Sequence, residues 1–247
     1  MKFVNTPAPS PEPESPHVPV WTPSQFKASK RTPALNDENE EFSLGETIAN
    51  AVSNGVSAAL AIAALVILIV MAVLHGGGVR LLVALVFGIP MLLAFLMSTL
   101  YHALPQELPK LIFKVLGHDF LFLYIAGAFT PYCVLTLGDT AAFTVLGIEW
   151  LIAVVGILIE SIWLNRPKWV PIVLCVGMCG LAVTLAPALI AALAPAGWWL
   201  LVAALCCFAL GLVLYLLRRV PYLWFVSHLV VLGGSVCLFL SVVLFVI

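Results

Sequence analysis

Charged side chains are scarce in this sequence. Only 9% of its 247 residues are Asp, Glu, Lys or Arg, whereas 63% are hydrophobic. Soluble domains carry about 25% charged and about 45–50% apolar residues, and one soluble core cannot hide this excess because a chain of this size must still cover its surface. The composition therefore excludes an ordinary soluble domain and makes membrane lipids the expected partners.

Basic clusters and paired cysteines are also missing. The net charge is −1, so the chain has no basic footprint and we expect no nucleic-acid partner. All six cysteines lie in apolar runs, where free Cys behaves as a small hydrophobe. Cys175 and Cys179 share a helix face, but no nearby His or second pair indicates a soft-metal site.

The first 42 residues lack the apolar content of a folded segment. They are rich in Pro, Ser and Glu, which predicts a disordered cytoplasmic tail whose soluble partner is unknown. The first residues contain no apolar run of the kind that a cleavable signal peptide carries. We therefore expect two parts, a tail over 1–42 and a membrane domain over 43–247.

Seven apolar stretches follow the tail, each near the ~20 residues that a helix needs to cross a bilayer. Backbone polar groups in lipid must find partners within the segment, so each stretch should be a helix. The predicted fold is all-α, a seven-transmembrane-helix bundle. Its expected spans are 48–74, 79–102, 113–136, 141–164, 170–193, 196–217 and 222–246.

Lys and Arg alternate between successive loops. The second, fourth and sixth loops carry Lys110 and Lys114, Arg166 and Lys168, and Arg218 and Arg219, while the third and fifth loops carry none. Cytoplasmic loops are the ones enriched in these residues. This pattern predicts a cytoplasmic N-terminus, a C-terminus outside, and a multi-pass protein of the cell membrane, with a bacterial inner membrane favoured.

Several polar groups converge at one predicted depth, near the cytoplasmic side. Ser98 and His102 are four residues apart and share a helix face. His118 and Asp119 open the third span, and His228 lies about two turns into the seventh. Asn50, Ser53 and Asn54 lie near the start of the first span. These groups could hold a metal and a water, or they could hydrogen-bond between helices.

Two acidic residues and the tryptophans complete the polar pattern. Glu149 lies inside the fourth span and should pair in the bundle or face a water-filled cavity, while Glu160 should snorkel near the inner end. Trp163, Trp169, Trp198, Trp199 and Trp224 fall near span ends, which is typical of an aromatic belt. The pair Gly233-Gly234 should allow close helix packing.

Four motifs in these spans resemble the hemolysin III family, in the larger group that contains the progestin and adipoQ receptors. They are Ser98-Thr-Leu-Tyr-His102, Ile125-Ala-Gly-Ala-Phe-Thr-Pro131, Ser227-His-Leu-Val-Val-Leu-Gly-Gly-Ser235, and Glu46, Asn50 and Gly55 at the start of the first span. They occur in the family's order, and the resemblance covers about Leu44 to Ile247. It implies the family's seven-helix fold and an intramembrane zinc near the cytoplasmic face.

The sequence departs from the family pattern at the implied zinc ligands. His102 and His228 match two of the family's three histidines, but the third falls on Trp224. The family's Asp, which helps to hold the metal-bound water, falls on Gly117. Asp119 lies about 200° further around the helix, so it does not simply replace that residue. Catalytic zinc usually has three protein ligands and a water.

Two functions of different class remain open at this stage. The favoured one is a non-enzymatic family member with a degenerate metal site and a membrane-integrity, cytolytic or channel-like role. The alternative is a zinc-dependent hydrolase of a lipid amide, as the resemblance implies. Its metal ligands would be His102, His228 and His118, with Ser98 and Asp119 as catalytic residues. A rhodopsin-like protein is disfavoured because the seventh span has no Lys for a retinal Schiff base.

Overall fold

A computed structural model of the chain describes residues 43–104, 107–163, 167, 169–217 and 220–247, without the side chains of 107 and 108. The predicted tail, 1–42, lies outside these residues. Within the described part there are seven helices long and apolar enough to cross a membrane, and no strand. They are α2 (Leu44–Leu74), α3 (Gly78–Ala103), α4 (Glu107–Pro131) with its π-helical continuation η1 (Tyr132–Leu137), α5 (Thr140–Ile162), α6 (Trp169–Ala192), α7 (Pro195–Leu216) and α8 (Leu223–Phe245).

The seven predicted spans are confirmed, with the largest shift at the start of the third. The third helix begins at Glu107, whereas the sequence predicted a start at 113 because Pro105 and Pro109 indicated a loop. Pro109 instead lies in the first turn of α4. Proline is tolerated there, since the first N–H groups of a helix have no partner within the helix.

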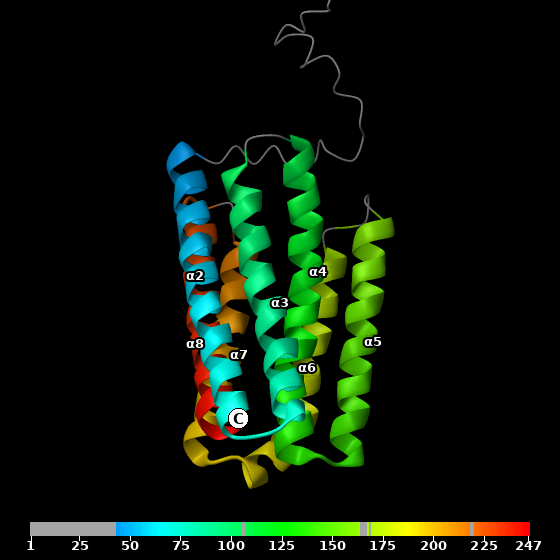
Figure 1. The fold of residues 1–247 in the computed structure, drawn as a ribbon. Coiled ribbons are helices and arrows are strands. Elements are labelled where there is room, and N and C mark those ends of the chain that lie inside the picture. Colours follow the sequence, from blue (N-terminus) through cyan, green and yellow to red (C-terminus); the bar gives the residue numbers. More distant parts are fainter. Residues whose placement is uncertain (1–42, 105–106, 164–166, 168, 218–219) are drawn as a thin grey trace, which may run out of the picture. The chain divides into compact units, whose positions relative to one another are not determined.

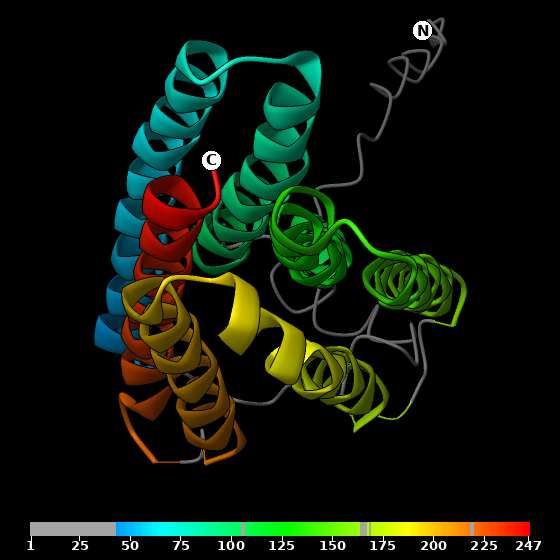
Figure 2. The same ribbon diagram turned by 90° about the horizontal axis from the view of Figure 1, so that it is seen from below.

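The helices follow one another around the bundle in chain order, as Figure 2 shows. α2 packs extensively on α3, α3 on α4, and α7 on α8, and the ring closes where α8 meets α2. α2 begins on one face and the chain ends on the other (Figure 1). We call these the N-terminal face, where α3 ends at Ala103, and the C-terminal face, where α4 and η1 end at Leu137.

Tyrosine hydroxyls cross the interior of the bundle and link its two sides. Tyr124 of α4 donates a hydrogen bond to Ser235 of α8 at 3.0 Å. Tyr132 of η1 donates to Ser241 of α8 at 2.8 Å, and Ser241 donates to the carbonyl of Gly197 on α7 at 2.9 Å. These buried bonds tie α4 to α8, which are otherwise separated along the ring.

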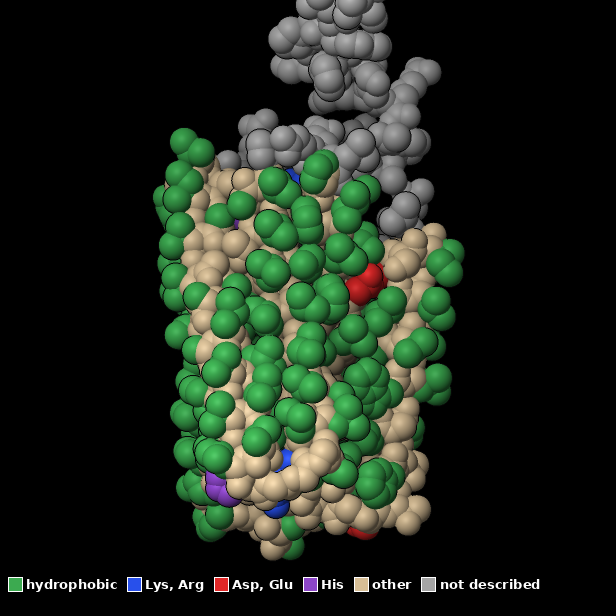
Figure 3. All heavy atoms as spheres, in the orientation of Figure 1, with side chains coloured by type: hydrophobic (Ala, Val, Ile, Leu, Met, Phe, Trp, Pro, Cys, Tyr) green, Lys and Arg blue, Asp and Glu red, His purple; other side chains and the backbone are tan. Residues whose placement is uncertain are grey.

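The outer surface of the helices is apolar, as a lipid-facing surface must be. Figure 3 shows hydrophobic side chains over most of the visible face. Large apolar residues such as Val183, Leu151 and Leu82 are more than 60% exposed. With seven helices of sufficient length in the described residues, the chain is a multi-pass membrane protein.

α3 and α4 approach each other closely at Gly127. A Cβ atom built on Gly127 would lie 2.5 Å from the backbone carbonyl oxygen of Val86. Backbone cannot move aside as a side chain can, so only glycine fits. A Cβ built on Gly234 would lie 2.9 Å from the Phe208 ring, whereas one built on Gly233 would have nothing within 4 Å. The predicted role in packing is thus confirmed for Gly234 and wrong for Gly233.

This difference predicts opposite effects of two identical substitutions. Gly127→Ala should lower stability by about 1–3 kcal/mol, because the added methyl overpacks the α3–α4 contact. Gly233→Ala should leave stability unchanged or raise it by up to about 1 kcal/mol, since alanine favours a helix over glycine. Thermal unfolding in detergent measures both. Equal effects of the two substitutions would contradict the described α3–α4 contact.

Candidate functional site

The two matched histidines meet inside the bundle near the N-terminal face. His102 comes from the last turn of α3 and is 4% exposed. His228 comes from the second turn of α8, and the two imidazole ring centroids are 5.5 Å apart at an interplanar angle of 80°. The sequence-based expectation that these two side chains lie at one depth is therefore consistent with their placement.

Trp224 joins this pair and makes it an aromatic cluster. Its indole packs edge-on against the His102 ring, with centroids 5.5 Å apart and planes at 86°. It also lies 6.3 Å from the His228 ring. Tyr215 of α7 packs edge-on against the other side of Trp224 at 5.5 Å. Two expectations concerned Trp224: a place in an aromatic belt, and the position of the family's third histidine beside His102 and His228. Its contacts with both imidazoles agree with the second expectation.

The start of α2 holds the turn that precedes α8 and its cluster residues in place. Ser43 and Glu46 form a capping box at the start of α2, in which each satisfies a backbone N–H of the other. The second carboxylate oxygen of Glu46 accepts a hydrogen bond from the N–H of Tyr222 at 2.8 Å. Tyr222 precedes α8 in the left-handed conformation, with φ of 61°. Glu46 thus acts as a structural clamp.

A polar stripe runs along the buried side of α2. Asn50, Ser53, Asn54 and Ser57 are each at most 5% exposed and follow the i, i+3, i+4, i+7 spacing of one helix face. Ser53 and Asn54 both donate to the carbonyl of Asn50. The side-chain amide of Asn50 has no hydrogen-bond partner among the described residues. These residues supply polarity inside the bundle but no side chain that prefers zinc.

Ser98 lies one turn before His102 on α3, as its spacing requires, and is half-buried. Its neighbour in sequence, Thr99, donates its hydroxyl back to the carbonyl of Phe95 at 2.8 Å. Tyr101 packs edge-on against His102 at 4.8 Å, and the Lys110 ammonium lies 5.2 Å from the centre of the Tyr101 ring. The surroundings of His102 are therefore mainly aromatic.

His118 does not join the histidine pair. Its Nδ1 atom lies 3.0 Å from Oε2 of Glu160 on α5, so its ring faces the α4–α5 contact. The expectation that Glu160 snorkels is wrong, because its side chain is 1% exposed and bonds His118. Asp119, the next residue of α4, is buried at 8% exposure.

The described side chains do not fit a catalytic zinc site. Across the described ranges, no group of three His, Cys, Asp or Glu side chains lies close enough together to hold a metal ion. His102 and His228 supply two imidazoles, and Trp224 stands beside them with an indole N–H that can only donate a hydrogen bond. One feature favours a ligand: Nε2 of His228 is buried and has no hydrogen-bond partner among the described residues.

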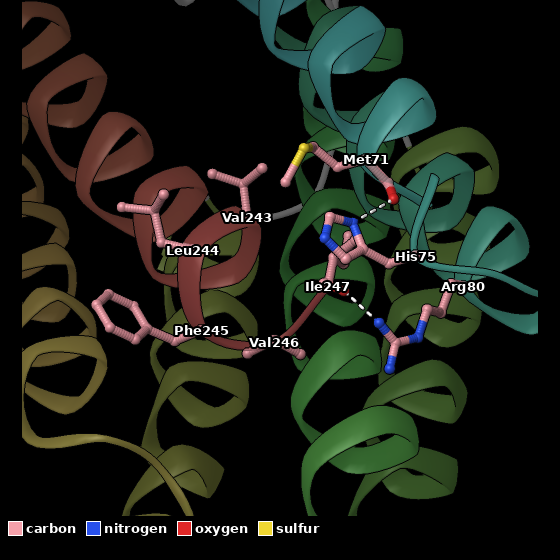
Figure 4. Close-up of a pocket in the computed structure, with 8 residues that line it drawn as sticks. All are labelled: Met71, His75, Arg80, Val243, Leu244, Phe245, Val246 and Ile247. Carbon is pink, nitrogen blue, oxygen red and sulfur yellow. Dashed lines mark hydrogen bonds between the residues drawn. The ribbon is translucent and has the colours of Figure 1, made fainter. Parts of the chain in front are cut away.

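A separate pocket opens at the C-terminal face, away from the predicted site. Figure 4 shows Arg80 and His75 directed toward the last residues of α8. Arg80 donates a hydrogen bond to the carbonyl oxygen of Ile247, and Nδ1 of His75 lies 2.9 Å from the carbonyl oxygen of Met71. The Arg80 bond connects the residue after the α2–α3 turn to the segment that follows α8, whereas the His75 contact stays at the end of α2. Neither involves a predicted site residue.

The His118–Glu160 contact predicts energetic coupling between α4 and α5. His118→Leu should destabilise the protein because it removes a contact of a buried carboxyl, and Glu160→Gln should relieve part of that cost. A double-mutant cycle of thermal unfolding in detergent should give a coupling energy of about 0.5–3 kcal/mol. Additive effects would contradict the pairing, and the same cycle between His118 and His228 should show no coupling.

Comparison with known proteins identifies the family of this chain. Residues 42–241 match the family described as Haemolysin-III related. The chain is 32% identical to the Hemolysin-3 homolog of Bacillus subtilis over 83% of this chain and 96% of the relative. It is 33% identical to Hemolysin-3 of Bacillus cereus over 81% of this chain and 92% of the relative. The chain therefore belongs to the haemolysin III family.

Proposed function

We propose that this protein acts within the membrane without zinc catalysis, as a haemolysin III family member whose metal site has degenerated. Its role is in membrane integrity, as a cytolytic or channel-like protein. The observation that carries this proposal is the position of Trp224, whose indole packs 5.5 Å from His102. Trp224 occupies the place of a histidine in the pattern that the family resemblance implies.

Two further features, at positions 117 and 118, also argue against a complete zinc site. Gly117 replaces the Asp of that pattern, and the nearest atom to a Cβ built there is Cβ of Met97 at 3.9 Å. No carboxylate is therefore supplied from this position. His118, a predicted third ligand, is engaged with Glu160. With two imidazoles and no third ligand in reach, the donor set falls short of the three that catalytic zinc uses.

The names of the relatives support a role at the membrane. Hemolysin-3 of Bacillus cereus and the Hemolysin-3 homolog of Bacillus subtilis are named for haemolysis. A cytolytic or channel-like activity needs a stable helical bundle in the bilayer and does not need a metal-bound water. The interhelical contacts at Gly127 and between Tyr124 and Ser235 supply that stability.

The alternative is a zinc-dependent hydrolase of a lipid amide. It is favoured by the buried, unpartnered Nε2 atom of His228 beside His102. In this alternative His102, His228 and His118 would be ligands, and Ser98 and Asp119 would be catalytic. It requires His118 to leave Glu160, and for that reason we place it second.

Dye release from liposomes that contain the purified full chain separates the two functions. We expect release above that of protein-free liposomes, unchanged by a zinc chelator and by Ser98→Ala or His102→Ala. Gly127→Ala should reduce release, since it disturbs the α3–α4 contact.

Two results would contradict the proposal. One is the absence of dye release from liposomes with the wild-type chain. The other is hydrolysis of a ceramide-type lipid amide that is lost in His102→Ala, which would support the alternative instead.

A further inference from the structure

Glu149 is a fully buried carboxyl group in the middle of α5. Its side chain is 0% exposed, and both carboxyl oxygens are buried without a hydrogen-bond partner among the described residues. It lies nine residues after Thr140, or about 14 Å into the helix from the C-terminal face. Ionisable groups at such depth are costly and commonly mark proton or ion pathways.

The surroundings of Glu149 offer no charge that compensates an ionised carboxylate. Cys133 of η1 and Cys179 of α6 are the titratable neighbours that interact with it electrostatically, and Asp139 in turn interacts with Cys133. No cationic side chain of the described residues acts on Glu149. An isolated carboxylate in an apolar medium is so unfavourable that the group takes up a proton instead.

A second buried carboxyl lies on the same face of α5. Glu160 follows Glu149 by eleven residues, which places it about 20° around the helix and about 16 Å along it. It is bonded to His118, whose side chain is 30% exposed. Figure 3 shows acidic side chains in the seam between α4 and α5, in the half nearer the N-terminal face. Because α5 begins at the C-terminal face, Glu160 lies nearer the N-terminal face than Glu149 does.

A phenylalanine ring separates the two carboxyls. Gly156 lies between them on α5, and a Cβ built on it would be 3.0 Å from the ring of Phe122 on α4. Phe122 is 1% exposed and packs with Ala126, Ala153 and Met178 in the small core of α4, α5 and α6. Ala126, Ala153 and Gly156 are small, so the ring fills the space beside α5 at this level.

The helix beside Glu149 is also irregular. After Pro131, α4 continues as the six-residue π-helix η1, which contains Cys133. Its last bond runs from the N–H of Gly138 to the carbonyl of Cys133 at 2.9 Å. π-helical turns are rare and occur frequently at functional sites. This irregularity is independent of the burial of Glu149 and lies next to it.

We propose that Glu149 is a proton-binding site that exchanges its proton with water through the α4–α5 seam, where Phe122 is the barrier toward the N-terminal face. The ligand is a proton. On release, it passes from the Glu149 carboxyl to water that enters the seam and then to bulk water, and a carboxylate remains on Glu149. This site uses α4, α5 and α6, so it does not rest on the state of the His102–His228 cluster.

Infrared difference spectroscopy on the full chain in lipid nanodiscs tests the site. Nanodiscs enclose no compartment, so leakage through the bilayer does not enter the measurement. At neutral pH the wild type should show the carbonyl stretch of a protonated carboxylic acid, shifted downward on transfer to D2O. Glu149→Gln should lose this band. Asp139→Asn is the matched control and should keep it, because Asn at a helix N-cap accepts the same backbone bond.

Exchange kinetics test the route. Phe122→Ala should speed the D2O-induced shift of the Glu149 band, because it removes the ring that packs in the seam. If Phe122→Ala does not fold, Phe122→Leu gives the same comparison with a smaller cavity. An absent band in the wild type, or a band that persists in Glu149→Gln, overturns the site. A rate unchanged by both Phe122 substitutions overturns the route.

Discussion

The structure depends on hydrogen bonding in a medium that supplies no partners of its own. A backbone in lipid must satisfy its polar groups internally, which makes each span a helix and leaves side chains as the means of joining helices. Tyr124 and Tyr132 join helices in this way, because their hydroxyls donate hydrogen bonds to serines of α8 across the interior. The same constraint makes unpartnered groups informative, since the amide of Asn50 and the carboxyl of Glu149 remain buried at a cost.

The fold followed from the sequence because lipid imposes a strong pattern. Apolar length predicted the seven helices. The largest shifts were at two helix starts: α2 begins at Leu44 rather than 48, and α4 begins at Glu107 rather than 113, where Pro109 fits a first helical turn. The site was harder to predict because depth along a helix follows from topology, whereas side-chain direction follows from helix rotation and packing. His102 and His228 meet, but His118 lies at a similar expected depth and faces Glu160. The π-helix after Pro131 had no distinct sequence signal, whereas the family motif already placed Trp224 beside His102.

Two polar regions coexist in one bundle and differ in character. The cluster of His102, His228 and Trp224 joins α3 and α8 through ring contacts, and the Glu46 clamp holds the turn that precedes it. The second region lies in the α4–α5 seam and contains buried carboxyls. A family scaffold that keeps its helix contacts can lose ligands from the first region without losing its fold, because those contacts depend on Gly127 and the tyrosines rather than on a metal.

We propose that Trp224 and Gly117 together leave the histidine cluster short of a complete zinc site. Metal content of the detergent-purified full chain, measured by mass spectrometry, tests it most directly. The account predicts less than stoichiometric zinc in the wild type and in the control Trp224→Phe, and about one zinc per chain once Trp224→His and Gly117→Asp restore the three-ligand pattern. About one zinc per chain in the wild type, lost in His228→Ala, would contradict it.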